Sequence, residues 1–199
     1  MASPDQHGWN ERYLKGEFGY RDPDPFVMDA HRDYLVPLLA DGSSGLDLAG
    51  GAGHHAIWLA QQGWRMTLAD FSDAALAMAK AHAMEAEVAL EMLSGNALDR
   101  VPKLIQQNRT FGFVLVLFFL DRSLLSLLPQ LLQPEGLLLY RTYTVDNVRL
   151  GNPRGPRNPE YLAQPQELLK AYSGMHILHY NETVAVKGVV ELIAQDTKI

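Results

Sequence analysis

Four residues, Gly50-Gly-Ala-Gly53, follow a short apolar segment and precede a run with helical spacing. Glycines between a strand and a helix permit a tight turn, let a ligand approach the backbone and let the helix pack closely on the sheet. The N–H groups at the start of the following helix favour an anionic group such as a carboxylate. Glycine alone does not distinguish the two possibilities, so this cluster predicts either a ligand site or a simple strand–helix turn.

A carboxylate adds specificity to this pattern. Asp70 closes the next apolar segment, 17 positions after Gly53. An acidic side chain roughly 20 residues beyond such glycines can accept hydrogen bonds from ribose hydroxyls. Asp70 could instead cap the following helix, although Ser72 is suited to that role. Given the glycines upstream, the spacing favours the ribose role for Asp70.

Other polar pairs carry less information. His54 and His55 follow the glycines, but adjacent residues at a helix start point in different directions, and no nearby group completes a metal site. We therefore expect no metal, and we expect His55 to lie beside the ligand pocket or to cap the turn. Asp121 and Arg122 follow a later apolar segment. They could orient a second ligand or simply start a helix. No pair predicts a catalytic dyad, so the catalytic residues remain unassigned.

Apolar runs alternate with longer, helix-like segments after residue 45, which predicts how these residues are positioned. The expected strands are Gly45–Ala49, Arg65–Ala69, Ala89–Leu93, Gly112–Phe118 and Gly136–Tyr143. The expected helices between them are His54–Gln62, Ser72–Glu87, Arg100–Gln107 and Arg122–Leu132. A short helix, Gln166–Tyr172, and a hairpin of Met175–Asn181 with Val189–Ala194 follow. Parallel strands need crossover connections, so this alternation predicts a doubly wound α/β fold.

Two segments break the alternation. Residues 1–25 set aromatic residues among charges, and Trp9, Arg12, Tyr13 and Tyr20 could form a lid over bound ligands. Trp9 and Tyr13 could equally pack one helix face onto the domain. Residues 144–165 contain four prolines and two glycines without a hydrophobic period. A long irregular insert of this kind is usually functional or disordered, and its arginines are either solvated or a clamp for an anionic ligand.

Composition limits the classes of function. The chain has 199 residues, 47% hydrophobic and 20% charged, with a formal net charge of −6 and no cysteine. The length predicts one domain over 1–199. The pattern of segments divides it into a helical lid over 1–40 and a core over 45–199. The composition and charge exclude disulfides and cysteine nucleophiles, and they argue against a nucleic-acid partner. The start of the chain does not resemble a signal peptide, and the apolar runs are too short to cross a bilayer. A cytoplasmic location is expected.

The motifs together resemble class I S-adenosylmethionine-dependent methyltransferases, in particular small bacterial members near the tellurite-resistance and thiopurine types. The resemblance covers most of the chain. Its motifs are Trp9-Asn-Glu-Arg-Tyr13, Leu46-Asp-Leu-Ala-Gly-Gly-Ala-Gly53, Thr67-Leu-Ala-Asp-Phe-Ser72, Ser94-Gly-Asn-Ala97, Phe113-Val-Leu-Val116 and Leu132-Gln-Pro-Glu-Gly-Leu-Leu-Leu-Tyr140. The resemblance implies a Rossmann-like, seven-stranded, mostly parallel sheet with an antiparallel C-terminal hairpin and helices on both faces.

The resemblance also implies roles for individual residues. Asp47, Gly51 and Gly53 would line the methionine end of S-adenosylmethionine, Asp70 would hold the ribose, and Phe71 would flank the adenine. The remaining cofactor positions implied are Ala49, Asn96, Ala97 and Leu117. The amide of Asn96 can replace the usual carboxylate because its carbonyl still accepts a hydrogen bond. Trp9, Arg12, Tyr13, Arg122 and Tyr143 are the candidates for contacting the methyl acceptor.

Four positions depart from the family's pattern. Ala49 replaces the first glycine of G-x-G-x-G, and Pro134-Glu-Gly136 replaces Pro-Gly-Gly. Gly112 stands where many relatives have an aspartate, and Arg141 stands where they often have an acidic residue. These changes bear more on turnover than on the fold.

The expected function is therefore methyl transfer from S-adenosylmethionine to a small-molecule acceptor, with S-adenosylhomocysteine as product. Transfer from a sulfonium is an in-line displacement that depends mainly on positioning, which can supply roughly 7–11 kcal/mol. One alternative is a cofactor-binding or partner-binding module without turnover, suggested by Gly112 and Arg141. Another is a nicotinamide-dependent oxidoreductase, which fits the glycine spacing and the C-terminal hairpin less well.

Overall fold

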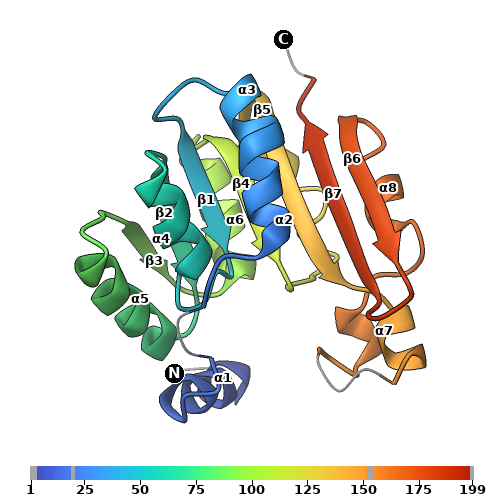
Figure 1. The fold of residues 1–199 in the computed structure, drawn as a ribbon, viewed down its shortest axis with the longest axis horizontal. Coiled ribbons are helices and arrows are strands. Elements are labelled where there is room, and N and C mark those ends of the chain that lie inside the picture. Colours follow the sequence, from blue (N-terminus) through green and yellow to red (C-terminus); the bar gives the residue numbers. More distant parts are fainter. Residues whose placement is uncertain (1–3, 19–20, 152–154, 198–199) are drawn as a thin grey trace. The chain divides into compact units, whose positions relative to one another are not determined.

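The computed structural model describes residues 4–18, 21–151 and 155–197 (Figure 1). The chain forms two compact units, Met1–Arg100 and Val101–Ile199. The division falls within helix α6 (Ala97–Gln106). The expectation of a single domain over 1–199 stays a prediction.

Three parallel strands form the centre of the first unit: β1 (Ser44–Leu48), β2 (Arg65–Asp70) and β3 (Glu91–Ser94). Their order is β3-β2-β1. Helices α4 (His54–Gln61) and α5 (Asp73–Glu85) provide the two crossovers that parallel pairing requires, and both pack against β2. The apolar residues of β1 and β2 are buried, as expected for strands covered by helices.

The N-terminal segment of this unit is helical, from α1 (Pro4–Leu14) through α2 (Pro25–Ala30) and a π-helical turn (His31–Leu35) to α3 (Val36–Leu38). Asp24 starts α2, because its side chain accepts a hydrogen bond from the N–H of Phe26 at 2.9 Å. Pro25 is the first residue of α2, where its missing N–H costs nothing.

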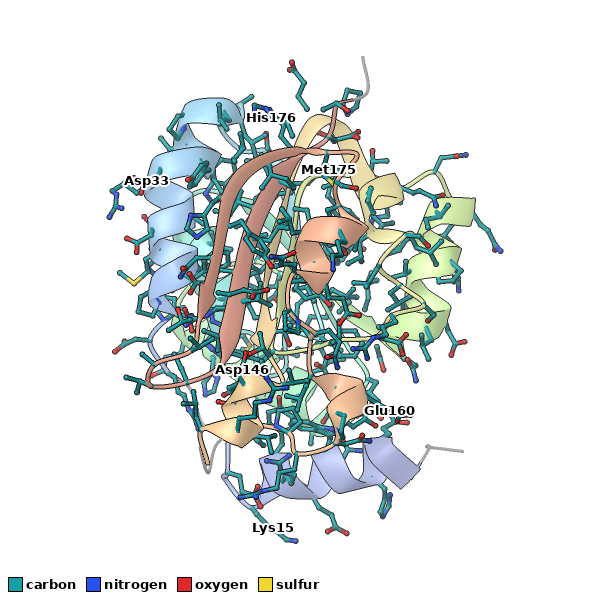
Figure 2. The ribbon with its side chains drawn as sticks, turned by 90° about the vertical axis from the view of Figure 1, so that its right-hand side faces the viewer. Lys15, Asp33, Asp146, Glu160, Met175 and His176 are labelled. Atoms are coloured by element: carbon teal, nitrogen blue, oxygen red, sulfur yellow. The ribbon has the colours of Figure 1, made fainter. Side chains whose placement is uncertain are left out.

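The second unit contains β4 (Phe111–Leu117), β5 (Leu132–Tyr143), β6 (His176–Thr183) and β7 (Val189–Gln195), in the order β4-β5-β7-β6. β4 and β5 are parallel, whereas β7 pairs antiparallel with both β5 and β6. Figure 2 shows β6 and β7 side by side with α8 (Glu167–Ala171) packed against them. Asp146 on α7 (Asp146–Arg149) and Glu160 on a 3₁₀ turn (Pro159–Tyr161) belong to the insert.

The predicted helix Arg122–Leu132 is wrong. This segment is a series of turns that ends in a 3₁₀ helix, Leu128–Leu131. Most of its backbone bonds join residues three apart, such as Leu127 N–H to the carbonyl of Leu124 at 2.9 Å. Pro129 explains the failure, because it has no N–H to donate and disfavours helical geometry in the residue before it. The leucine spacing resembled a helix, but the backbone could not complete one.

Most other boundaries differ from the prediction by one or two residues, and two differ by more. Helix α6 begins at Ala97 instead of Arg100, because the side chain of Asn96 accepts a hydrogen bond from Leu98 N–H at 2.9 Å. Strand β5 begins at Leu132 and takes up Pro134-Glu-Gly136 as an irregularity, where its register to β4 shifts. A turn before the strand was expected there.

The predicted fold class is confirmed. The seven strands belong to one mixed sheet, mostly parallel, with an antiparallel C-terminal hairpin and helices around it. In the described part of the chain, no helix is both long and apolar enough to cross a membrane.

Candidate functional site

The glycine cluster forms a left-handed turn between β1 and α4. Ala49, Gly51 and Gly53 all have positive φ, of 57°, 58° and 75°. Gly50 cannot carry a side chain, since a Cβ there would lie 2.5 Å from the carboxylate carbon of Asp47. The turn is therefore held close above the end of β1.

Asp70 fastens this turn to the next strand. One of its carboxylate oxygens accepts the N–H of Gly51 at 2.9 Å, and the other accepts the N–H of Ser72 at 2.8 Å. Burial raises the pKa of Asp70, and the backbone N–H groups oppose that shift. Ser72 caps α5 by accepting the N–H of Ala75 at 3.1 Å, as its sequence position suggested. Asp70 thus shapes the turn.

Asp47 is the least satisfied carboxylate of the site. It is 1% exposed, and neither oxygen makes a hydrogen bond of normal geometry within the described part of the chain. Burial, followed by the charge of Asp70, raises the pKa of Asp47 to about 7, and the backbone of Ala56 offsets this only in part. A buried acceptor without a partner is costly. A cationic or hydrogen-donating ligand would satisfy it.

Helix α1 lies over this turn and is held by polar contacts. Gln6 donates to the carbonyl of Phe71 at 2.6 Å, and Asn10 accepts from the hydroxyl of Ser72 at 2.6 Å. The hydroxyl of Tyr13 reaches Gly51 so closely that a Cβ there would collide with it. Burial and the charge of Asp70 raise the pKa of Tyr13, which keeps it protonated.

An aromatic cluster joins α1 to the residues that follow it. Trp9, Tyr13 and Phe18 have ring centroids 5.4 to 6.2 Å apart. The Arg12 guanidinium lies 4.5 Å from the ring centroids of both Trp9 and Phe18. The rings of Trp9 and Tyr13 pack on each other, whereas a cover of these residues over a ligand stays a prediction. Tyr20 lies outside the described residues.

The other cofactor candidates in the first unit follow β2 and β3. Phe71 is half-buried and comes directly after Asp70, where it is available to flank a ring. Asn96 and Ala97 follow β3, and the Asn96 carbonyl oxygen already accepts the N–H of Leu98. The capping role of Asn96 was not predicted, nor were the contacts of Gln6 and Asn10. Polar residues four apart on one helix face could have indicated a docked helix.

The remaining candidates lie in the second unit. Leu117 ends β4, and Tyr143 ends β5. Arg122 is fully engaged by the insert: its guanidinium bonds both carboxylate oxygens of Glu167, at 2.6 and 2.9 Å, and the carbonyls of Glu160 and Leu162 at 2.7 and 3.0 Å. Such a bidentate arrangement makes Arg122 a positioning residue for the insert. Few of the Arg122 donors therefore remain for contact with a methyl acceptor.

The histidines after the glycine turn do not diverge as expected. The rings of His54 and His55 pack together with centroids 3.9 Å apart. Burial lowers the pKa of His54 to about 4, so this residue is neutral at physiological pH. Among the described residues no group of three or more histidine, cysteine or acidic side chains could hold a metal ion.

The structure also shows where Gly112 and Arg141, two of the departures from the family's pattern, lie. Gly112 lies near the start of β4, far from the carboxyl end of that strand. The carbonyl of Gly112 would be 3.0 Å from a Cβ added at Gly136, so the backbones are close there. Arg141 is buried on β5 and pairs with Glu191 on β7 at 3.1 Å. Both positions have structural roles, which weakens them as evidence against turnover.

Comparisons with known proteins agree with this geometry. Residues 46–136, which include the glycine turn and Asp70, match the model of the methyltransferase domain family. No curated protein sequence matches the chain. The fold is similar to that of TehB from Haemophilus influenzae, with a TM-score of 0.70 and 16% identity over 94% of this chain and 67% of TehB.

Two further solved structures share the fold. The N-methyltransferase NodS from Bradyrhizobium japonicum has a TM-score of 0.64 at 15% identity, over 89% of this chain and 100% of NodS. The [4+2]-cyclase SpnF has a TM-score of 0.69 at 15% identity, over 98% of this chain and 97% of SpnF. Residues 46–136 therefore match a methyltransferase domain, and the chain shares its fold with a solved N-methyltransferase. The resemblance found in the sequence is confirmed.

Proposed function

We propose that this protein transfers a methyl group from S-adenosylmethionine to a small-molecule acceptor. The observation that carries the proposal is the buried, unpartnered Asp47 carboxylate beneath the Gly50–Gly51 turn, with Asp70 fixed beside it. The turn admits a ligand against its backbone, and the carboxylates supply acceptors for an ammonium and for ribose hydroxyls. When bound, S-adenosylmethionine supplies a methyl group on a positively charged sulfur.

The residues of the first unit divide the work of binding. Asp47 would take the amino group of the methionine end, which satisfies its buried oxygens. Asp70 would take the ribose, with the backbone of Gly51 held beside it. Phe71 and Ala97 would flank the adenine, and Ala49 and Asn96 are the other positions of this unit implied by the family.

Helix α1 would exclude water from the bound ligand. Tyr13, neutral because its pKa is raised, presents a hydroxyl to the turn, and the aromatic cluster around Arg12 covers it. Removal of water strengthens the electrostatic interactions on which positioning depends. No strong base is needed if the acceptor arrives ionised.

The acidic composition and the absence of a membrane-crossing helix in the described chain support a small soluble acceptor over nucleic acid or lipid. We propose a cytoplasmic location as well. The second candidate, a binding module without turnover, predicts the same affinity for the cofactor but no product.

Calorimetry with S-adenosylhomocysteine tests the binding step. We expect micromolar affinity, on the order of −8 kcal/mol. No binding of either S-adenosylmethionine or its product would reject the proposal. Formation of S-adenosylhomocysteine in a screen of phenols, thiols, amines and tellurium oxyanions would then reject the binding module, whereas binding without product in every case would favour it.

A further inference from the structure

Phe118, directly after β4, has an unusual backbone and an unusual exposure. Its φ is 55°, in the left-handed region that bulky side chains avoid. Its N–H donates to the carbonyl of Arg141 at 2.7 Å, which fixes this conformation. The ring is nevertheless 40% exposed, so burial of the side chain does not repay the strain. Strained residues held by their surroundings often mark ligand sites.

The Phe118 ring has a rigid support. It stacks on Tyr143 with centroids 5.0 Å apart and an interplanar angle of 36°. A Cβ at Gly155 of the insert would lie 3.0 Å from two carbons of the Tyr143 ring, so the insert backbone closes against that ring. The two aromatic rings form a platform whose Phe118 component remains accessible.

A buried ion pair sets the electrostatics of the platform. The Arg141 guanidinium lies 5.5 Å from the Phe118 ring centroid. It is paired with Glu191, whose other oxygen lies 3.7 Å from Nε2 of His179. Arg141 is therefore neutralised and buried, and it does not provide a site for an oxyanion. The Arg141 guanidinium already interacts with the negative face of the Phe118 ring, so the ring does not favour a second cation.

The platform also occupies the end of the sheet where ligands bind. β4 and β5 are parallel, and Leu117 lies opposite Arg141 in their register. Phe118 and Tyr143 thus mark the carboxyl ends of two neighbouring parallel strands. In open α/β sheets the crevice outside these ends holds the ligand.

We infer that the Phe118–Tyr143 platform binds a flat aromatic ring, and that the methyl acceptor is an aromatic compound with a hydroxyl, thiol or amino group. Electron-rich rings stack well on aromatic faces in offset geometry. This inference rests on the proposed methyl transfer. The acceptor's heteroatom uses a lone pair to bond the methyl carbon, while the carbon–sulfur bond breaks with its electrons retained by sulfur. The proton of the heteroatom passes to water.

Binding of a matched pair of probes tests the platform without turnover. 4-Methylphenol and 4-methylcyclohexanol share size and hydroxyl group but differ in aromaticity, and saturation-transfer NMR with the full chain measures both. We expect 4-methylphenol to bind roughly two- to tenfold more tightly, and Phe118→Leu to remove that preference. Phe118→Tyr, which keeps a ring, should retain it.

Tyr161→Leu is the matched control, because Tyr161 is another exposed aromatic residue of the same unit that lies outside the platform. It should leave the preference unchanged. If Phe118→Leu fails to fold, Tyr143→Leu takes its place. Equal binding of the two probes, or an unchanged preference in both platform variants, would overturn the inference. Calorimetry with S-adenosylhomocysteine on the same samples separates this result from failure of the proposed function.

Discussion

The carboxylate of Asp70 accepts the backbone N–H of Gly51 across 19 positions of sequence, at 2.9 Å. With its second oxygen on Ser72, Asp70 joins the glycine turn to the end of β2 and the start of α5. The residue expected to hold the ribose therefore also builds the turn on which the rest of the cofactor would lie.

Replacing Asp70 should lower stability and affinity together. Asp70→Ala leaves two buried N–H groups without their charged acceptor, a loss of about 3 kcal/mol in the free energy of unfolding. Denaturant unfolding measures the stability, and calorimetry with S-adenosylhomocysteine measures the affinity at a temperature where the variant is folded. Asp41→Ala, at an exposed loop residue, is the control and should change neither. Unchanged affinity in folded Asp70→Ala would remove Asp70 from the site.

Asp47 should make the stability of the free protein depend on pH. Its folded pKa of about 7 lies above the ordinary value of 3.8, so the folded state holds a proton that the unfolded state loses between these values. Stability should therefore fall as the pH rises from about 4 to about 7, and then level off. Thermal unfolding across this range should show the decline, and Asp47→Asn should reduce it, leaving the smaller part that the raised pKa of Asp70 contributes. A similar decline in that variant would assign the effect to another group.

The same carboxylate should link cofactor binding to proton release. A bound ammonium favours ionised Asp47, so affinity for S-adenosylhomocysteine should rise with pH up to about 7 and change little above it. Calorimetry at pH 6 in buffers of different ionisation enthalpy measures the released protons. Asp47→Asn should bind more weakly and release fewer protons. Equal proton release in the wild type and this variant would contradict the assignment.

Replacement by glycine should cost less stability at Ala49 than at an alanine within a helix. Its φ of 57° is unfavourable for a side chain, so Ala49→Gly should keep or raise stability by up to about 1 kcal/mol. Ala60→Gly is the matched control, because Ala60 is also half-buried but lies within α4. It should lose about 1 kcal/mol. Similar losses at both positions, measured by denaturant unfolding, would mean that the turn differs from the structure.

The buried pair on β5 and β7 should show strong coupling. Arg141→Met leaves the half-buried Glu191 carboxylate without its guanidinium, and Glu191→Met leaves the buried Arg141 without its carboxylate. Each should cost roughly 3–5 kcal/mol, whereas Arg141→Met with Glu191→Met should be much closer to the wild type. A double-mutant cycle in denaturant measures the coupling. Additive losses would show that the two side chains act independently.

Predictions of the fold and the site from the sequence were most accurate where neighbouring residues determine the local structure. The apolar run before Gly50, the glycines and the spacing to Asp70 are local patterns, and they located β1, the turn and β2. The insert and the end of β4 depend on distant partners instead. Arg122 finds Glu167 45 residues away, and Phe118 is held in its left-handed conformation by the Arg141 carbonyl. No local pattern in either segment indicates these contacts, and Pro129 made a helical leucine pattern misleading.

The two ends of the insert, residues 144–165, lie next to each other. Thr144 and Ala163 form an isolated bridge, and the N–H of Val145 and the carbonyl of Ala163 are 3.0 Å apart. Gly188 packs against Asn147 with no room for a Cβ, which fixes the entry of the insert on the hairpin. Because the segment enters and leaves the sheet at one point, a change of length between these two ends leaves the pairing of β5 with β7 in place.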